Sequence, residues 1–253
     1  MRVLIVGEVP FVDTLAGLCR AKNHRVDLFV SDTLEDQETL DNMVRAATRC
    51  QIAIESLNES QSAKLWLVEG VEVNLPPDVP LLASALATSS TEIASWTQHP
   101  ERVVGYGLLP PIPTAGLVEF APAQQSDFQF VMQARRFWEE LGFGTVRVPD
   151  GAGLVRPRII CSVINEAARI LATSGLSVED LDTAMQHGTN YPRGPLAWAD
   201  EIGLDVVVGI LEGLVRYWGD ERFRPAPLLR QKVYAGHLGR KTGRGFYKYE
   251  LTP

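Results

Sequence analysis

Residues 1–30 read MRVLIVGEVPFVDTLAGLCRAKNHRVDLFV, and this stretch decides the fold. Its first seven residues are an almost unbroken apolar run, which predicts a strand buried on both faces. Apolar residues at helical spacing follow at Leu15, Leu18 and Cys19, and His24–Val30 returns to a strand pattern. A strand, a helix and a second strand in succession predict a βαβ unit with two parallel strands.

The same alternation continues to about residue 150. A helix is predicted from Ser126, as N-cap, to Leu141, before the helix-stopping Gly142. Five more strands are predicted at residues 51–57, 80–86, 102–109, 117–120 and 144–148. We therefore expect an α/β fold, in which residues 1–150 form a Rossmann-like, doubly wound and mostly parallel sheet.

The pattern changes after Pro149, where almost every segment has helical spacing. Ser177–Asp180 resembles a capping box in front of one of these helices. Residues 151–253 are therefore predicted to form a second, all-helical domain.

Bulk composition excludes several classes of function. A net charge of -7 argues against general binding to nucleic acid or anionic membranes, because both need clustered Lys and Arg. No apolar stretch reaches the roughly 18 residues that a membrane span requires. The three cysteines, Cys19, Cys50 and Cys161, are far apart and form no CxxC pair, so a reducing cytoplasm is the expected location.

The first strand-to-helix turn is where such a sheet usually binds a dinucleotide. Glycines are needed there because the pyrophosphate must approach backbone N–H groups at the helix N-terminus. Here only Gly7 matches, and Val9 and Val12 stand where the second and third glycines are expected. Pro10 removes a backbone donor and Glu8 adds negative charge, so each change works against phosphate binding.

The end of the second strand is where an acidic residue usually binds the ribose hydroxyls. The position expected for it is Val30, and Asp32 follows two residues later. Asp32 is therefore the candidate for ribose binding, beside Gly7 for the phosphates. The alternative is that Asp32 only caps a following helix.

The C-terminal half carries an ordered series of motifs. They are Asn165–Ala167, Ser177–Met185, Gly188–Pro195, Gly203–Asp205, Arg222–Pro225 and Gly239–Tyr249. This series resembles the C-terminal domain of the 3-hydroxyacyl-CoA dehydrogenases, including 3-hydroxybutyryl-CoA dehydrogenases. The N-terminal half resembles the family more loosely, through Thr88–Ser90, Pro100–Gly105, Leu117–Glu119 and Pro149–Leu154. The resemblance implies NAD as cofactor, acyl-CoA as ligand and a homodimer formed through the C-terminal domain.

In this family a histidine, held by a glutamate, takes the proton of the substrate hydroxyl while a serine and an asparagine place the substrate oxygens. The resemblance maps the serine to Ser89 and the glutamate to Glu119. The histidine position is occupied by Gly107 and the asparagine position by Pro157, and neither residue can supply the missing function. Ser89 is equally explained as the cap of a helix.

Two arginines are candidates for the acidic groups of an acyl-CoA. Arg156 and Arg158 flank Pro157, close to where the family binds its substrate, although arginines at the start of a helix are otherwise unremarkable. None of the four histidines stands where it would replace the missing base, and no metal-binding spacing is present.

Three hypotheses follow. The favoured one is a divergent family member with weak or lost NAD-dependent activity, which acts as an acyl-CoA-binding or dimerising subunit. The second is an active NAD-dependent 3-hydroxyacyl-CoA dehydrogenase that uses a rearranged site. The third is an enzyme with different chemistry, built on Ser89, Glu119 and the two arginines.

Overall fold

The computed structural model describes residues 1–250. The chain forms two compact units. The first comprises Met1–Leu108 and Ile112–Val155, and the second comprises Leu109–Pro111 together with the residues from Arg156 onward.

The first unit is built on one seven-stranded sheet with the order β2-β1-β3-β4-β5-β6-β7. The first five strands are parallel, whereas β6 runs antiparallel to β5 and parallel to β7. The strands are β1 (Arg2–Gly7), β2 (Arg25–Val30), β3 (Ile52–Ser56), β4 (Leu81–Ser84), β5 (Val103–Gly107), β6 (Leu117–Pro122) and β7 (Gly144–Arg147). The predicted doubly wound, mostly parallel sheet is confirmed.

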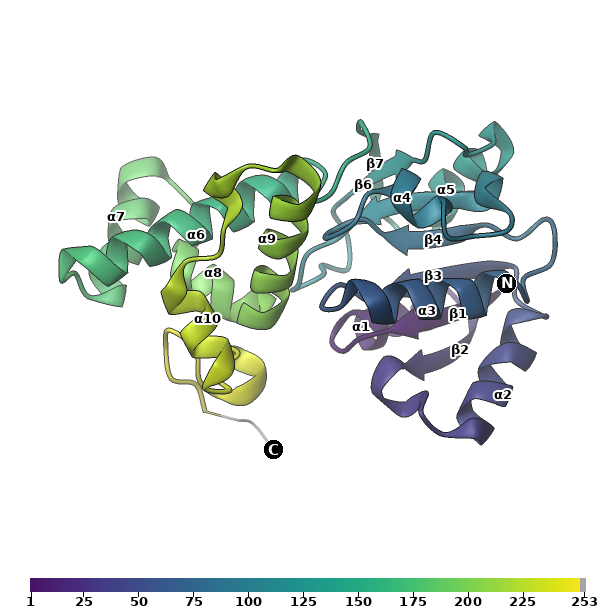
Figure 1. The fold of residues 1–253 in the computed structure, drawn as a ribbon, viewed down its shortest axis with the longest axis horizontal. Coiled ribbons are helices and arrows are strands. Elements are labelled where there is room, and N and C mark those ends of the chain that lie inside the picture. The colour runs from purple at the N-terminus through teal and green to yellow at the C-terminus, as the bar shows by residue number, and fades with distance from the viewer. Residues whose placement is uncertain (251–253) are drawn as a thin grey trace. The chain divides into compact units, whose positions relative to one another are not determined.

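Helices cover both faces of this sheet (Figure 1). They are α1 (Phe11–Ala21), α2 (Gln37–Ala47), α3 (Gln61–Glu72), the short α4 (Ser90–Ala94) and α5 (Phe128–Glu140). Strand β1 shows why the sheet needs two covered faces. Val3 and Ile5 pack into the core beneath α1 and α5, and Leu4 and Val6 pack into the core beneath α2 and α3. Strand β1, which is paired on both sides, is therefore apolar at every inner position.

One predicted cap is wrong. Helix α5 begins after Asp127, and the Ser126 hydroxyl instead donates a hydrogen bond to the carbonyl oxygen of Val103, at 2.5 Å. Ser126 therefore fastens the chain to the start of β5. A cap and a tether use the same side chain, so composition alone does not separate them.

The second unit is helical. Its α-helices are α6 (Arg156–Ser174), α7 (Val178–Thr189), α8 (Pro195–Ile202), α9 (Leu204–Trp218) and α10 (Pro227–Tyr234). The capping interaction predicted for α7 is confirmed, since the Ser177 hydroxyl accepts the Asp180 N–H at 3.0 Å. Asp200 ties the C-terminal turn to α8, because its carboxylate accepts the N–H groups of Phe246 and Tyr247, each at 2.8 Å.

Candidate functional site

The carboxyl ends of β1 and β3 meet at the position where a doubly wound sheet usually holds a dinucleotide. Gly7 closes β1 with a φ of 144°, and a Cβ at this position would lie 2.7 Å from the backbone carbon of Ser56. A glycine is therefore required there by the close approach of the two strands. The structure places the predicted cofactor residue Gly7 at the expected edge and gives it a packing role.

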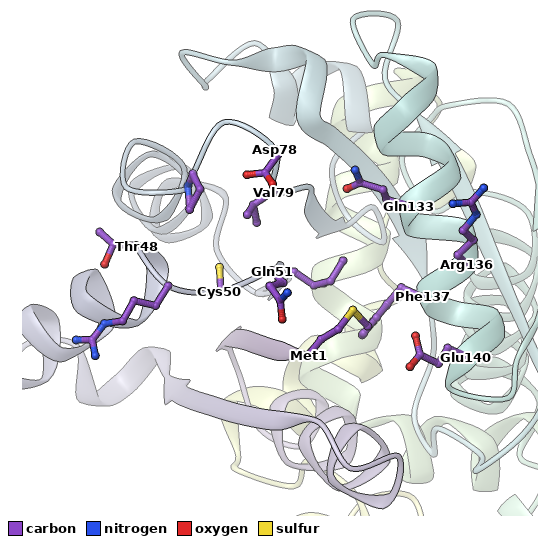
Figure 2. Close-up of a pocket in the computed structure, with 13 residues that line it drawn as sticks. Met1, Thr48, Cys50, Gln51, Asp78, Val79, Gln133, Arg136, Phe137 and Glu140 are labelled. Atoms are coloured by element: carbon purple, nitrogen blue, oxygen red, sulfur yellow. The ribbon is translucent and has the colours of Figure 1, made fainter.

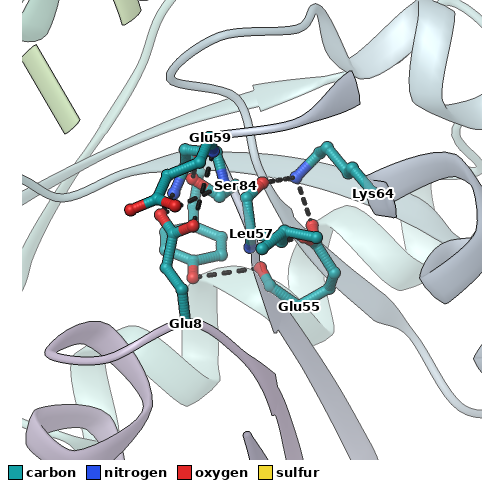
Figure 3. A network of polar contacts seen from close by, with 8 residues as sticks. Glu8, Glu55, Leu57, Glu59, Lys64 and Ser84 are labelled. Carbon is teal, nitrogen blue, oxygen red and sulfur yellow. Dashed lines mark hydrogen bonds and ion pairs between the residues drawn. The ribbon is translucent and has the colours of Figure 1, made fainter. Parts of the chain in front are cut away.

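Glu8 turns inward directly after Gly7 and is 5% exposed. Its carboxylate accepts the backbone N–H and the side-chain amide of Asn58, both at 3.1 Å, and the backbone N–H of Glu59 at 3.4 Å. Burial raises the pKa of Glu8, and these hydrogen bonds oppose that shift without cancelling it. Figure 3 shows Glu8 beside Glu59 at the carboxyl edge of the sheet.

A buried ion pair lies next to it, and sequence reasoning missed this pair. Glu55 on β3 and Lys64 on α3 form an ion pair while exposing 0% and 1% of their surfaces (Figure 3). The Lys64 ammonium also donates to the carbonyl oxygen of Leu57 at 2.9 Å, and the Glu55 carboxylate accepts the Leu57 N–H at 2.6 Å. Burial raises the pKa of Glu55 more than Lys64 lowers it. The available signal was a glutamate inside an otherwise apolar strand, since a buried charge requires a partner.

The residues of this edge do not fit a bound diphosphate. The Asn58 and Glu59 N–H groups, which point to the site, are already occupied by the Glu8 carboxylate. Pro10 offers no N–H in the turn, and the peptide bond before it is cis. Asp32 lies in the short 3-10 segment Ser31–Thr33 after β2, where it is exposed and accepts the Ser31 hydroxyl at 3.4 Å.

The second predicted centre lies where β5 and β6 pair. Gly107 stands directly opposite Glu119 in the antiparallel register. Glu119 is 6% exposed, and its carboxylate accepts the Val155 N–H at 2.9 Å. The position that faces Glu119 across the strands therefore carries no side chain, and no proton acceptor comes from it.

Ser89 lies at the start of α4 and is 3% exposed. Its hydroxyl accepts the Glu92 N–H at 3.2 Å, so it caps that helix. The Asp150 carboxylate accepts the next two N–H groups, of Ser90 and Thr91, at 2.8 and 2.9 Å. The capping role is thus satisfied, and a catalytic role for Ser89 stays a prediction.

The structure places the four histidines in separate parts of the fold. His99 precedes β5, at the opposite end of that strand from Gly107, and contacts Glu101 at 3.3 Å. His24 precedes β2 and is buried, and burial lowers its pKa. His187 is exposed in the last turn of α7, and His237 follows α10 in the second unit.

The remaining predicted residues lie at the start of α6. Pro157 is the second residue of this helix and is buried. The Arg158 guanidinium stacks over the Trp218 ring, 4.6 Å from its centroid, which gives that arginine a packing role. Arg156 lines a hollow of about 240 Å³ within the second unit; the other lining residues include Ile159, Ile160, Val163, Ile164, Pro195 and Trp198.

The first unit also contains a hollow of about 470 Å³ at the opposite edge of its sheet (Figure 2). Met1, Gln51 and Val79 line it, and these residues precede β1, β3 and β4. Ligands of doubly wound sheets bind outside the carboxyl ends of the strands, so this hollow lies at the wrong edge for a nucleotide. Arg136 and Glu140 of α5 stand on its rim with opposite charges.

Within residues 1–250, no cluster of His, Cys, Asp or Glu side chains is arranged to hold a metal ion. No helix in that range combines the length and the apolar character needed to cross a membrane.

Comparison with known proteins settles the family. The sequence model of the 3-hydroxyacyl-CoA dehydrogenase NAD-binding domain matches residues 17–151, and that of the family's C-terminal domain matches residues 153–249. The chain belongs to the 3-hydroxyacyl-CoA dehydrogenase family. It is 37% identical to a probable 3-hydroxybutyryl-CoA dehydrogenase of Bacillus subtilis over 221 residues, which cover 87% of this chain and 74% of that protein.

Other relatives agree with this placement. A 3-hydroxybutyryl-CoA dehydrogenase of Clostridioides difficile is 36% identical over 201 residues, covering 78% of this chain and 70% of that protein. The crystal structure of an (S)-3-hydroxybutyryl-CoA dehydrogenase from Ralstonia eutropha superposes with a TM-score of 0.78 at 29% identity, covering 98% of this chain and 99% of that one.

NAD is the cofactor for which the matched N-terminal domain of the family is named. The match to that domain begins at residue 17, after β1 and after the turn that carries Glu8 and Pro10. The sequence match of the first unit therefore leaves out β1 and this turn, whereas the superposition with the Ralstonia eutropha structure covers 98% of the chain. The turn departs from the dinucleotide pattern, although residues 17–151 match the family's NAD-binding domain.

Proposed function

We propose that this member of the 3-hydroxyacyl-CoA dehydrogenase family has weak or lost NAD-dependent activity and acts as an acyl-CoA-binding or dimerising subunit. The observation that carries the proposal is Gly107 opposite Glu119. Positioned general bases contribute roughly 10²–10⁴-fold to reaction rates, so a site without one loses a factor of that order. The Glu8 carboxylate supports the same proposal for cofactor binding, because it already accepts the Asn58 and Glu59 N–H groups.

Acyl-CoA is the proposed ligand because the named relatives act on 3-hydroxybutyryl-CoA. The apolar hollow beside α6 supports binding of the acyl part, and Arg156 at its edge supports binding of a neighbouring acidic group. The other proposed site residues are Ser89, Glu119 and Arg158. Gly7 and Asp32 are the residues proposed for any remaining nucleotide binding.

A homodimer through the second unit is part of the proposal. Helix α6 exposes Ile159 and Ile170, which are 55% and 42% exposed and lie eleven positions apart, close to three full helical turns. Both side chains therefore lie on one face, and a second copy of the chain is the partner proposed to cover it. The proposed location of the protein is the cytoplasm, in keeping with three free, buried cysteines.

The test is a calorimetric titration of the purified protein with NADH and then with acetoacetyl-CoA, followed by a turnover assay with 3-hydroxybutyryl-CoA and NAD. We expect acetoacetyl-CoA to bind and turnover to be about 10²–10⁴-fold below that of a relative with an intact site. Full turnover would overturn the proposal. Absence of acyl-CoA binding would remove the ligand-binding role and leave only the dimerising role. Analytical ultracentrifugation of the purified protein tests for the dimer.

The second candidate is an active dehydrogenase of fatty-acid or related acyl-CoA metabolism with a rearranged site. The retained Glu119, buried at the end of the paired strands β5 and β6, is the observation that favours it. Under this alternative, Glu119→Gln abolishes turnover, while Glu139→Gln, on the exposed face of α5, leaves turnover unchanged.

A further inference from the structure

The buried position of Glu8 calls for a physical reason. A carboxylate taken out of water without partners is costly, and Glu8 has no Lys or Arg among its hydrogen-bond donors. Its partners are instead two successive backbone N–H groups and one amide side chain. These donors belong to the loop that joins β3 to α3, fifty residues further along the chain.

Successive backbone N–H groups at the carboxyl edge of a parallel sheet form an anion-binding arrangement. The Asn58 side chain is held in place as a third donor, because its carbonyl oxygen accepts the Ser84 hydroxyl at 2.6 Å. That contact orients the Asn58 NH₂ group toward Glu8. The loop therefore has the chemistry of a phosphate cradle, and its occupant is a side chain of the same protein.

The turn after β1 completes the closure. The Val12 N–H donates to the Glu8 carbonyl oxygen at 3.2 Å, and the Thr14 N–H donates to the Pro10 carbonyl oxygen at 3.2 Å. Pro10 has no N–H to offer. The Thr14 bond is the ordinary first bond within α1, but the Val12 N–H is a first-turn donor that a ligand would otherwise use. One donor at the amino end of α1 is thus occupied, and the Glu8 carboxylate adds negative charge where a diphosphate would approach.

We propose that the Glu8 carboxylate is an internal anion, which occupies the cradle formed by Asn58 and Glu59 and excludes the diphosphate of a nucleotide. Glu8 is then a specificity-determining residue that acts by exclusion. This inference rests on the proposed loss of ordinary cofactor binding and names the residue responsible. Removal of the carboxylate frees the two N–H groups for an external anion of the same geometry.

The test compares equilibrium binding of ADP to the wild type, Glu8→Ala and Asp13→Asn. Asp13 is the matched control because it is an exposed acidic residue in the first turn of α1, and its substitution removes one charge without freeing a loop donor. We expect Glu8→Ala to bind ADP at least about tenfold more tightly than the other two proteins. The Asn58 and Glu59 amide resonances should shift with ADP in Glu8→Ala and stay unchanged in the wild type.

Two outcomes would overturn the inference: wild-type protein that binds ADP as tightly as Glu8→Ala, or Glu8→Ala that shows no gain over Asp13→Asn. If Glu8→Ala does not fold, Glu8→Ser carries the same comparison, because it also removes the carboxylate and its short side chain leaves the two loop N–H groups free. The readout is binding and not turnover. An active wild type would therefore refute the proposed function while the ADP comparison still decides the role of Glu8.

Discussion

Substitution of Lys64 by Met should destabilise the first unit strongly. The Glu55 carboxylate, fully buried, would lose its cation, and the Leu57 carbonyl oxygen would lose a donor. Removal of one partner of a buried ion pair costs about 3–5 kcal/mol of the free energy of unfolding. Because burial raises the pKa of Glu55, this loss should shrink as pH falls and the carboxyl becomes protonated in the folded state.

A second substitution should then restore stability. In Glu55→Gln/Lys64→Met the buried charge is gone, while an amide oxygen at position 55 still accepts the Leu57 N–H. We expect this double variant to lose only about 1–3 kcal/mol relative to the wild type, as for an unsatisfied carbonyl and altered packing. Adding Glu55→Gln to Lys64→Met should therefore raise stability by about 2 kcal/mol.

The assay is urea unfolding followed by tryptophan fluorescence in a Trp198→Phe/Trp218→Phe background, where the remaining tryptophans, including the buried Trp138, all report on the first unit. Arg135→Met is the control. It breaks an exposed pair with Glu139, which lies 2.7 Å away, and should cost no more than about 0.5 kcal/mol. A double variant no more stable than Lys64→Met, or a Lys64→Met loss as small as the control, would refute the reasoning.

Three further predictions concern other parts of the molecule. Burial raises the pKa of Cys19, Cys50 and Cys161 to about 12, so the folded protein should show no fast reaction with a thiol reagent at pH 8, whereas the unfolded chain should react at all three. Burial raises the pKa of Glu8 above its ordinary 4.5, so its contribution to stability is present below pH 4.5 and is lost as pH rises through the folded-state pKa. The urea midpoint of the wild type, relative to that of Glu8→Gln, should therefore decrease when the pH is raised from 4 to 8. Gly194→Ala should lower the free energy of unfolding, measured by thermal unfolding, by about 2–3 kcal/mol, because its Cβ would lie 2.1 Å from the Asp182 carboxyl carbon. That carboxylate accepts the Leu196 and Ala197 N–H groups at the start of α8. Gly188→Ala is the control, since no atom of the described residues, apart from its own helix backbone and chain neighbours, would lie within 4 Å of its Cβ, and an equal effect of the two substitutions would contradict this prediction.

Periodicity was enough to predict the sheet and the helical second domain, because each strand and helix has its own local signal. Val3 and Ile5 alternate with Leu4 and Val6 between two cores, and an uninterrupted apolar run is what such a strand requires. Local capping was less predictable. The Ser126 hydroxyl donates to the Val103 carbonyl oxygen and does not accept a helix N–H, and the helix starts one residue later, after Asp127.

The site was harder to predict because its contacts join distant positions. Glu8 stood out as a charge in the wrong place for a phosphate, but its donors lie fifty residues away and follow from the pairing of β1 with β3. Lys64 lies on a helix, where lysines are usually exposed, and its burial follows only from its pairing with Glu55 on β3. Charges that pair across a fold leave no periodic signal, and only the improbability of a buried charge points to them.

Retention of Glu119 does not by itself argue for retained catalysis. A buried carboxylate needs donors whether or not a histidine stands across from it, and the Val155 N–H supplies one. The same holds after the carboxyl end of β1, where Glu8 is satisfied by the loop that would otherwise accept a ligand. In both places a buried carboxylate has a partner inside the protein. The fold can therefore remain stable after the reaction is lost, and turnover, rather than stability, is the measurement that separates the two proposed functions.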